Sequence, residues 1–105
     1  MKLTDKELEI MSVLWESEDP LTATEIIEAS DNRTWKESSI YIIMNTLIKK
    51  GAVLLALHKP TITNNARAYA PTITMEEYTL AYIKQTGLNL DISALIKCLM
   101  DEIKE

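Results

Sequence analysis

The sequence is poor in the residues from which several common kinds of site are built. It has one cysteine, Cys98, so an internal disulfide is excluded and the fold does not depend on an oxidising compartment. One histidine and one cysteine are too few for the usual four-ligand zinc site, and two glycines cannot form a phosphate-binding loop. We therefore expect that the chain is not an enzyme and needs no metal or cofactor.

Long hydrophobic runs are also missing. The longest, residues 40–44 and 52–57, are far too short to span a bilayer. The N-terminal ten residues carry charges where a signal peptide needs an apolar stretch. We therefore expect a cytoplasmic protein of one domain's length that has no membrane partner.

Charge is distributed unevenly along the chain, whose net charge is −5. Residues 1–32 and 68–105 carry net charges of −7 and −3, whereas residues 33–67 carry +5. A local positive field can attract a phosphate backbone even when the whole chain is acidic. The alternative interpretation is that acidic helices merely flank a mixed central segment.

Three helix starts follow one pattern, in which an apolar residue precedes a threonine, and a glutamate and then an apolar residue follow three and four residues after it. This pattern is a capping box with a hydrophobic staple, and it occurs at Thr4, Thr22 and Thr74. It predicts helices over residues 5–17, 23–30 and 75–86, and a stripe of apolar residues predicts another over residues 36–50 that stops at Gly51. The expected inward-facing residues of the first three helices are Leu8, Met11, Leu14, Trp15, Ile26, Ile27, Ile40, Ile43, Met44, Leu47 and Ile48. Trp35 is expected to pack at the entry to the third helix.

The segment after Gly51 has the character of a β-hairpin. Residues 52–57 form one expected strand, residues 58–66 a loop, and residues 67–70 a returning strand. Three helices followed by a hairpin are the winged helix-turn-helix arrangement, in which the third helix can enter the major groove of DNA. We therefore predict a mainly α protein with a small β-hairpin, and the basic segment coincides with the third helix and the hairpin.

The C-terminal segment is expected to serve dimerisation. Asp91 can cap a last helix over residues 92–104, whose apolar stripe lies outside the three-helix core and would be exposed in water. This gives a division into residues 1–74, a DNA-binding domain, and 75–105, a helical dimerisation segment, unless the last helix folds back on its own domain. The expected interface residues are Tyr78, Tyr82, Ile92, Leu95, Ile96, Leu99, Met100 and Ile103. Cys98 is interpreted as a small hydrophobic residue at this interface, with a redox sensor as the alternative.

Five stretches follow one another along the chain, namely residues 3–15 (LTDKELEIMSVLW), 21–27 (LTATEII), Trp35, 45–51 (NTLIKKG) and 67–71 (RAYAP). In this order they resemble the penicillinase-repressor family of winged-helix regulators. The resemblance covers about the first 75 residues. It implies a homodimeric repressor that binds a palindromic operator, dimerises through interlocking C-terminal helices and is released by proteolysis or, in the copper branch, by metal.

The sequence departs from the family pattern at several points. The front of the third helix lacks arginine, Lys36 replaces the usual hydroxyl cap, and the tail ends at Glu105, before the expected last dimerisation helix. It contains neither the cysteine-rich metal motif nor an Asn-Phe cleavage dipeptide. These departures leave the upstream protease or sensor without support from the sequence.

The expected DNA-binding residues divide into two groups. Ser38, Tyr41, Ile42 and Asn45 on the solvent side of the third helix, with Ser39, can contact bases or phosphates. Asn45 suits adenine and Ile42 a thymine methyl, so the set favours A·T-rich sites. Phosphate contacts are expected from the basic residues Lys36, Lys49, Lys50, Lys59 and Arg67.

Two functions of different classes remain open from the sequence. The first is a homodimeric repressor that binds double-stranded operator DNA and excludes polymerase. The second is a winged-helix protein-interaction module that has lost sequence-specific DNA binding, which the acidic net charge and the weakly basic third helix would favour.

Overall fold

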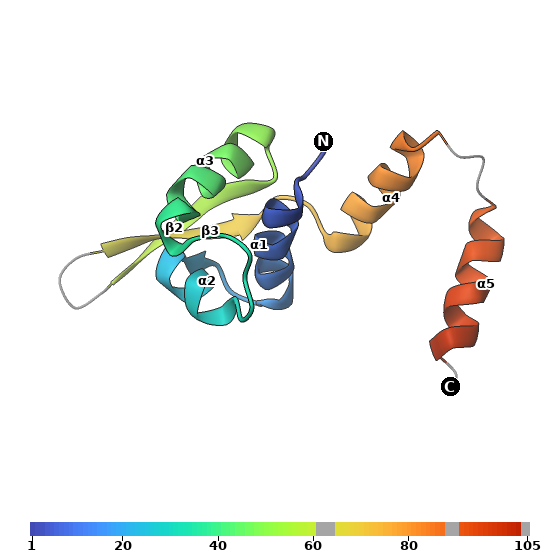
Figure 1. Cartoon of the computed structure of the whole chain (residues 1–105), viewed down its shortest axis with the longest axis horizontal. Coiled ribbons are helices and arrows are strands. Elements are labelled where there is room, and N and C mark those ends of the chain that lie inside the picture. The colour runs from blue at the N-terminus through green and yellow to red at the C-terminus, as the bar shows by residue number, and fades with distance from the viewer. Residues whose placement is uncertain (61–64, 88–90, 104–105) are drawn as a thin grey trace.

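The computed structural model describes residues 1–60, 65–87 and 91–103 (Figure 1). Three helices and a hairpin form the body of the molecule, and two further helices follow, as the sequence predicts. In chain order the elements are α1 (Asp5–Glu16), β1 (Leu21–Thr22), α2 (Ala23–Ala29), the 3-10 turn η1 (Glu37–Ser39), α3 (Ile40–Lys50), β2 (Val53–Pro60), β3 (Asn65–Pro71), α4 (Met75–Gln85) and α5 (Ile92–Ile103). The winged helix-turn-helix prediction is therefore confirmed.

The helix ends follow from local side-chain chemistry. All three predicted capping boxes are formed, with the threonine hydroxyl accepting from the glutamate N–H and the glutamate carboxylate accepting from the threonine N–H. Gly51 ends α3 with a φ of 79°, a left-handed conformation that glycine adopts without strain. Asp91 caps α5, because its Oδ1 accepts from the Ala94 N–H at 3.1 Å.

The start of α3 differs from the prediction. The sequence predicted one helix over residues 36–50, whereas a 3-10 turn covers Glu37–Ser39 and the α-helix begins at Ile40. Lys36 occupies the cap position of this turn without a side-chain cap hydrogen bond. A lysine side chain carries no acceptor, so it cannot satisfy the first free N–H groups as serine or threonine would.

The sheet has three strands rather than the two of the predicted hairpin. Their order is β1-β3-β2, and all neighbours are antiparallel. β1 is only two residues long and pairs Leu21 with Tyr69 and Thr22 with Ala68. The hairpin strands are longer than predicted, because cross-strand pairing continues from Leu57↔Ala68 out to Pro60↔Asn65. The tip of the expected loop, residues 61–64, lies outside the described residues.

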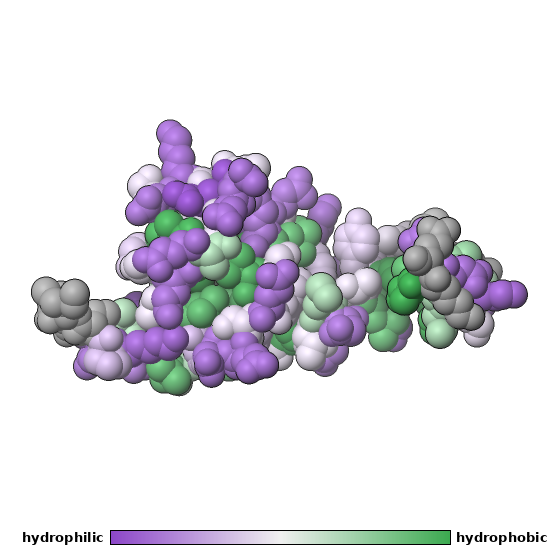
Figure 2. Space-filling view, turned by 90° about the horizontal axis from the view of Figure 1, so that it is seen from below, coloured by the Kyte–Doolittle hydropathy of each residue, from purple (hydrophilic) through white to green (hydrophobic). Residues whose placement is uncertain are grey.

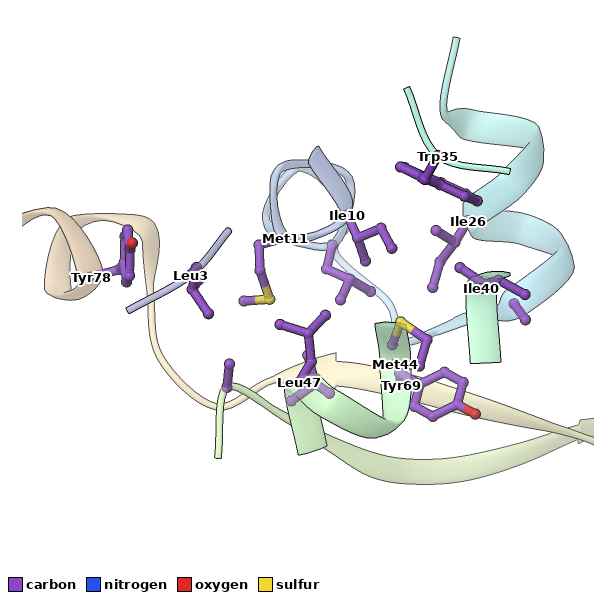
Figure 3. Close-up of a cluster of buried hydrophobic side chains, with 14 residues drawn as sticks. Leu3, Ile10, Met11, Ile26, Trp35, Ile40, Met44, Leu47, Tyr69 and Tyr78 are labelled. Atoms are coloured by element: carbon purple, nitrogen blue, oxygen red, sulfur yellow. The ribbon is translucent and has the colours of Figure 1, made fainter. Parts of the chain in front are cut away.

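The core lies between the helices and the inner face of the sheet. Figure 3 shows side chains of α1, α2 and α3 pointing toward one another, with Tyr69 of β3 beside them. The largest fully buried side chains are Ile10, Met11, Leu14, Ile26, Met44 and Leu47. Trp35 is also buried, as predicted, and Trp15 packs partly buried against this cluster.

One expected core residue is not in the core. Ile48 was assigned to the buried stripe of α3, but it is 40% exposed. The buried side of α3 is formed by Ile40, Met44 and Leu47, which are spaced by four and three residues, and Ile43 packs partly buried beside them. Ile48 therefore falls at the edge of the packed face.

The first half of α4 packs on the body. The Trp15 indole N–H donates to the Ile73 carbonyl at 2.9 Å, and the ring centroids of Trp15 and Tyr78 lie 5.9 Å apart. Tyr78 is only 7% exposed and belongs to the core cluster. The start of α4 is therefore packed against α1. The predicted boundary between a DNA-binding domain and a dimerisation segment, at residues 74 and 75, stays a prediction.

The last helix stands apart from the body (Figure 1). The radius of gyration is 16.2 Å, whereas a compact domain of this length has about 13 Å. Figure 2 shows hydrophobic residues on the surface of this C-terminal part of the molecule. Within the described ranges, no helix combines the length and apolar character that a membrane crossing requires.

Candidate nucleic-acid interface

The solvent face of α3 carries the predicted base-reading residues. Because Met44 and Leu47 point into the core, the opposite side of the helix presents Tyr41, Ile42 and Asn45 to solvent. Tyr41 is 60% exposed and Ile42 is 70% exposed, which are large values for apolar or aromatic side chains. Ser38 is exposed in the preceding turn, and Ser39 is half-buried. Their contact with DNA stays a prediction.

Tyr41 lines two surface hollows, which lie between α3 and the neighbouring elements α2 and β3. One, of about 510 Å³, includes Ser38 and Tyr41 with the first turns of α2. The other, of about 300 Å³, includes Tyr41, the start of α2, and Arg67 on β3. The structure therefore brings Ser38, Tyr41 and Arg67 together, although 29 residues separate the first from the last.

Thr24 lines both hollows and was missed by the sequence analysis. It is the second residue of α2, the helix that precedes α3 in the helix-turn-helix. In this motif the first helix crosses the DNA backbone, so a hydroxyl at its start is placed to contact phosphate. The position of Thr24 just inside a capping box was a signal that could have identified it.

Lys50 forms an ion pair and a hydrogen bond with other residues of its own chain. Its Nζ lies 2.6 Å from Glu7 Oε1 and donates to the Lys2 carbonyl at 2.9 Å, which ties the end of α3 to the start of α1. Burial raises the pKa of Glu7, but hydrogen bonds from Lys50 and Thr4 outweigh it and hold that pKa below its usual value. The prediction that Lys50 contacts phosphate is therefore not supported, because its ammonium compensates a carboxylate that is only 3% exposed.

Lys59 is also paired. Its Nζ lies 3.1 Å and 3.4 Å from the two carboxylate oxygens of Glu25, at the start of α2. The Thr22 N–H and Lys59 together lower the pKa of Glu25. The Lys59 side chain thus reaches back from the hairpin to the helices.

Arg33 makes a further ion pair, at 3.5 Å from Glu37, and its guanidinium lies 5.4 Å from the Trp35 ring centroid. Among the described residues, ion pairs therefore engage three of the six cations of the basic segment. Lys36, Lys49 and Arg67 are exposed and carry no ion pair in that part of the chain. These three cations are the ones that the structure leaves available for an anionic partner.

The sequence profile of the penicillinase repressor family matches residues 3–102. The chain belongs to this family. It is 35% identical over 77 residues to the penicillinase repressor of Bacillus licheniformis, a match that covers 73% of this chain and 56% of that protein. The chain thus spans a little over half the length of this curated relative.

A solved structure supports the fold. A PadR family transcription regulator from Clostridium difficile R20291 superposes with a TM-score of 0.54 at 16% identity, covering 97% of this chain and all of that one. This likeness concerns the fold alone. The penicillinase repressor family consists of transcriptional regulators, which agrees with the expectation from the sequence that the chain is not an enzyme.

The C-terminal helices of this repressor-family chain present an apolar surface. On α5, Ile92, Ile96, Leu99, Met100 and Ile103 are exposed and Leu95 is half-exposed. Cys98 is exposed on the same helix. Tyr82 is exposed on α4, with its ring centroid 6.4 Å from that of Tyr78.

Tyr78 corrects the predicted dimer interface. It was assigned to the interface, but its side chain is buried against Trp15 within its own chain. The aromatic ring fills the junction between α1 and α4, where the Trp15 indole is already held by its hydrogen bond to Ile73. The remaining interface residues stay predictions.

Proposed function

We propose that this chain is a homodimeric transcriptional repressor that acts in the cytoplasm on palindromic promoter DNA, using α3 and the hairpin as a wing. The observation that carries the proposal is the convergence of Ser38, Tyr41 and Arg67 around two hollows beside the exposed face of α3. Membership of the penicillinase repressor family supports the same function. By occupying the promoter, the dimer excludes polymerase sterically.

Base reading falls to the polar face of α3. Asn45 can donate to and accept from adenine at once, and Ile42 can pack on a thymine methyl. The exposed positions of α3 carry no arginine, the side chain that most often reads guanine. The proposed operator is therefore rich in A·T pairs.

Phosphate contacts fall to Lys36, Lys49 and Arg67, with hydroxyl contacts from Thr24 and Tyr41. Each neutralised phosphate makes the fall of log Kobs with log[salt] steeper by about 0.9, so three cations in each of two protomers give a slope of about −5. The five cations per protomer that are expected from the sequence would give a slope of about −9. The slope therefore counts the contacts directly.

Dimerisation falls to α5. Its apolar stripe has no covering element in the described part of the chain, and an exposed stripe of this kind marks an interaction surface. A second copy related by a two-fold axis covers both stripes at once, which is the commonest assembly of soluble proteins. In such a dimer each α3 would read one half-site, and helix-turn-helix dimers read half-sites that lie one helical turn, about 34–36 Å, or a multiple of it apart.

The test is the binding of the purified chain to fragments of its own genome at about 50 and 200 mM salt. We expect a few fragments to remain bound at the higher salt and to share a palindromic, A·T-rich sequence. The triple variant K36M/K49M/R67M, which leaves all three ion pairs in place, is expected to retain no fragment at the higher salt. No enrichment of any fragment by the wild type at either salt would contradict the proposal and favour the protein-interaction module.

A further inference from the structure

The outer half of the hairpin has little lateral support. β1 pairs with β3 only at Ala68 and Tyr69, so from Arg67 outward β3 has β2 as its one neighbouring strand in the described residues. An isolated two-stranded ribbon is at best marginally stable in water. The position of this part of the hairpin relative to the helices therefore depends on contacts other than strand pairing.

Lys59 provides such a contact. It lies in the outer half of β2, opposite Ala66, and its Nζ reaches both carboxylate oxygens of Glu25 on α2. Among the described residues it is the one ion pair that joins the hairpin to a helix, since Lys50–Glu7 joins α3 to α1 and Arg33–Glu37 is local.

The receiving carboxylate is itself held in place. Glu25 Oε1 accepts from the Thr22 N–H at 2.9 Å as half of the capping box that begins α2. Because this bond fixes the Glu25 rotamer in advance, the pair with Lys59 needs the ordering of only one long side chain. Glu25 therefore serves both the start of α2 and the attachment of the hairpin.

The strand register connects this attachment to Arg67. Lys59 faces Ala66, and Arg67 follows directly in β3, where it lines the hollow shared with Tyr41 and Thr24. Fixing Lys59 to α2 therefore fixes the distance between Arg67 and the start of α3. On the basis of the proposed function, we propose that Lys59 and Glu25 are positioning residues that hold the wing so that Arg67 meets a DNA phosphate, and that Lys59 makes no phosphate contact.

The test measures binding of the full chain to an operator fragment across a salt series, for K59M, E25Q and R67M. Loss of the ion pair is expected to weaken operator binding by about two- to fivefold per protomer, the range of partly exposed pairs, with the salt slope unchanged. R67M, by contrast, is expected to reduce the slope by about 0.9 per protomer, because it removes a phosphate contact. E25Q keeps an oxygen acceptor for the Thr22 N–H, so the start of α2 is preserved.

Two further variants identify the cause. The double variant K59M/E25Q is expected to lose no more affinity than either single variant, because both remove the same contact. K59R is expected to restore binding, since a guanidinium can pair with the same carboxylate. Unchanged far-ultraviolet circular dichroism spectra of all variants at the temperature of the binding assay confirm that the fold is retained.

The outcomes separate this inference from the function on which it rests. A slope that falls by about 0.9 per protomer in K59M would assign Lys59 to a phosphate and overturn the positioning role. Additive losses in the double variant would overturn it as well. Failure of the wild type to bind any DNA would instead overturn the proposed function, and the inference with it.

Discussion

The body and the C-terminal helices are built by the same local rules but differ in what covers their apolar faces. The capping box that begins α1 and α2 also begins α4, and an aspartate caps α5. In the body, Ile10, Met44 and Leu47 are fully buried, whereas Ile103 on α5 is 81% exposed. The difference shows that forming a helix and burying its apolar face are separate events, because α5 is formed while its apolar stripe stays exposed in the described part of the chain.

The largest effect on stability is expected from a substitution in the buried core of the body. Leu47→Ala removes a fully buried side chain and leaves a cavity, so the free energy of unfolding should fall by about 2–5 kcal/mol in urea denaturation. The matched change on α5, Ile96→Ala, should cost the isolated protomer far less, because Ile96 is exposed there. Equal losses from both changes at a protein concentration too low for dimers would contradict the comparison.

The next largest effect is expected on dimerisation, from a substitution in the exposed apolar stripe of α5. Leu99→Asp places a charge where the proposed interface needs an apolar side chain, and each Leu99 that it removes contributes about 1.5–3 kcal/mol of burial. We expect light scattering to report a monomer. Ala94→Asp is the control, because Ala94 lies on the opposite side of α5 from the stripe, and that variant should remain dimeric. A dimer that survives Leu99→Asp would place the interface elsewhere.

A third effect concerns the surface that the body presents to DNA. Asn45→Ala should weaken binding to the operator by about 1–3 kcal/mol, the value of one bidentate contact to a base. Binding to unrelated DNA should hardly change, because the phosphate contacts remain. Fluorescence anisotropy with both DNAs checks this, and equal losses on both would remove Asn45 from the base-reading set.

The smallest effect is a dependence on pH that belongs to the body alone. Glu7 and Glu25 have pKa values below their usual range in the folded protein, so they bind protons more weakly when folded than when unfolded. Their contribution to stability is therefore complete above about pH 5 and is lost as the pH falls through the folded pKa values. In E7Q the unfolding free energy should depend less steeply on pH below about pH 4.5, and an unchanged profile would mean that Glu7 is not responsible.

Local signals predicted most of the fold. Threonine and glutamate three residues apart gave helix starts at Asp5, Ala23 and Met75, and Gly51 gave the end of α3. Long-range contacts were not predictable in this way. The strand β1 depends on Tyr69 and Ala68, almost fifty residues away, and the extra pairing of the hairpin depends on register rather than on residue type.

Some features of the candidate site could be predicted from the sequence and others could not. The exposed face of α3 followed from helical spacing, because burying Met44 and Leu47 leaves Asn45 on the other side. The availability of the cations did not follow, because Lys50 and Lys59 meet glutamates that lie 43 and 34 residues away in the sequence. Charge counted along the chain therefore does not show which cations are already paired with glutamates.

The sequence alone determined the order of the helices and the hairpin, the three capping boxes and the family, because each depends on residues within a few positions of one another or on a pattern read in order. Only the tertiary structure decided which cations form ion pairs, that Tyr78 packs on its own chain, and that Arg67 and Tyr41 line one hollow. These depend on distances between residues far apart in the chain, which the packing of the core sets.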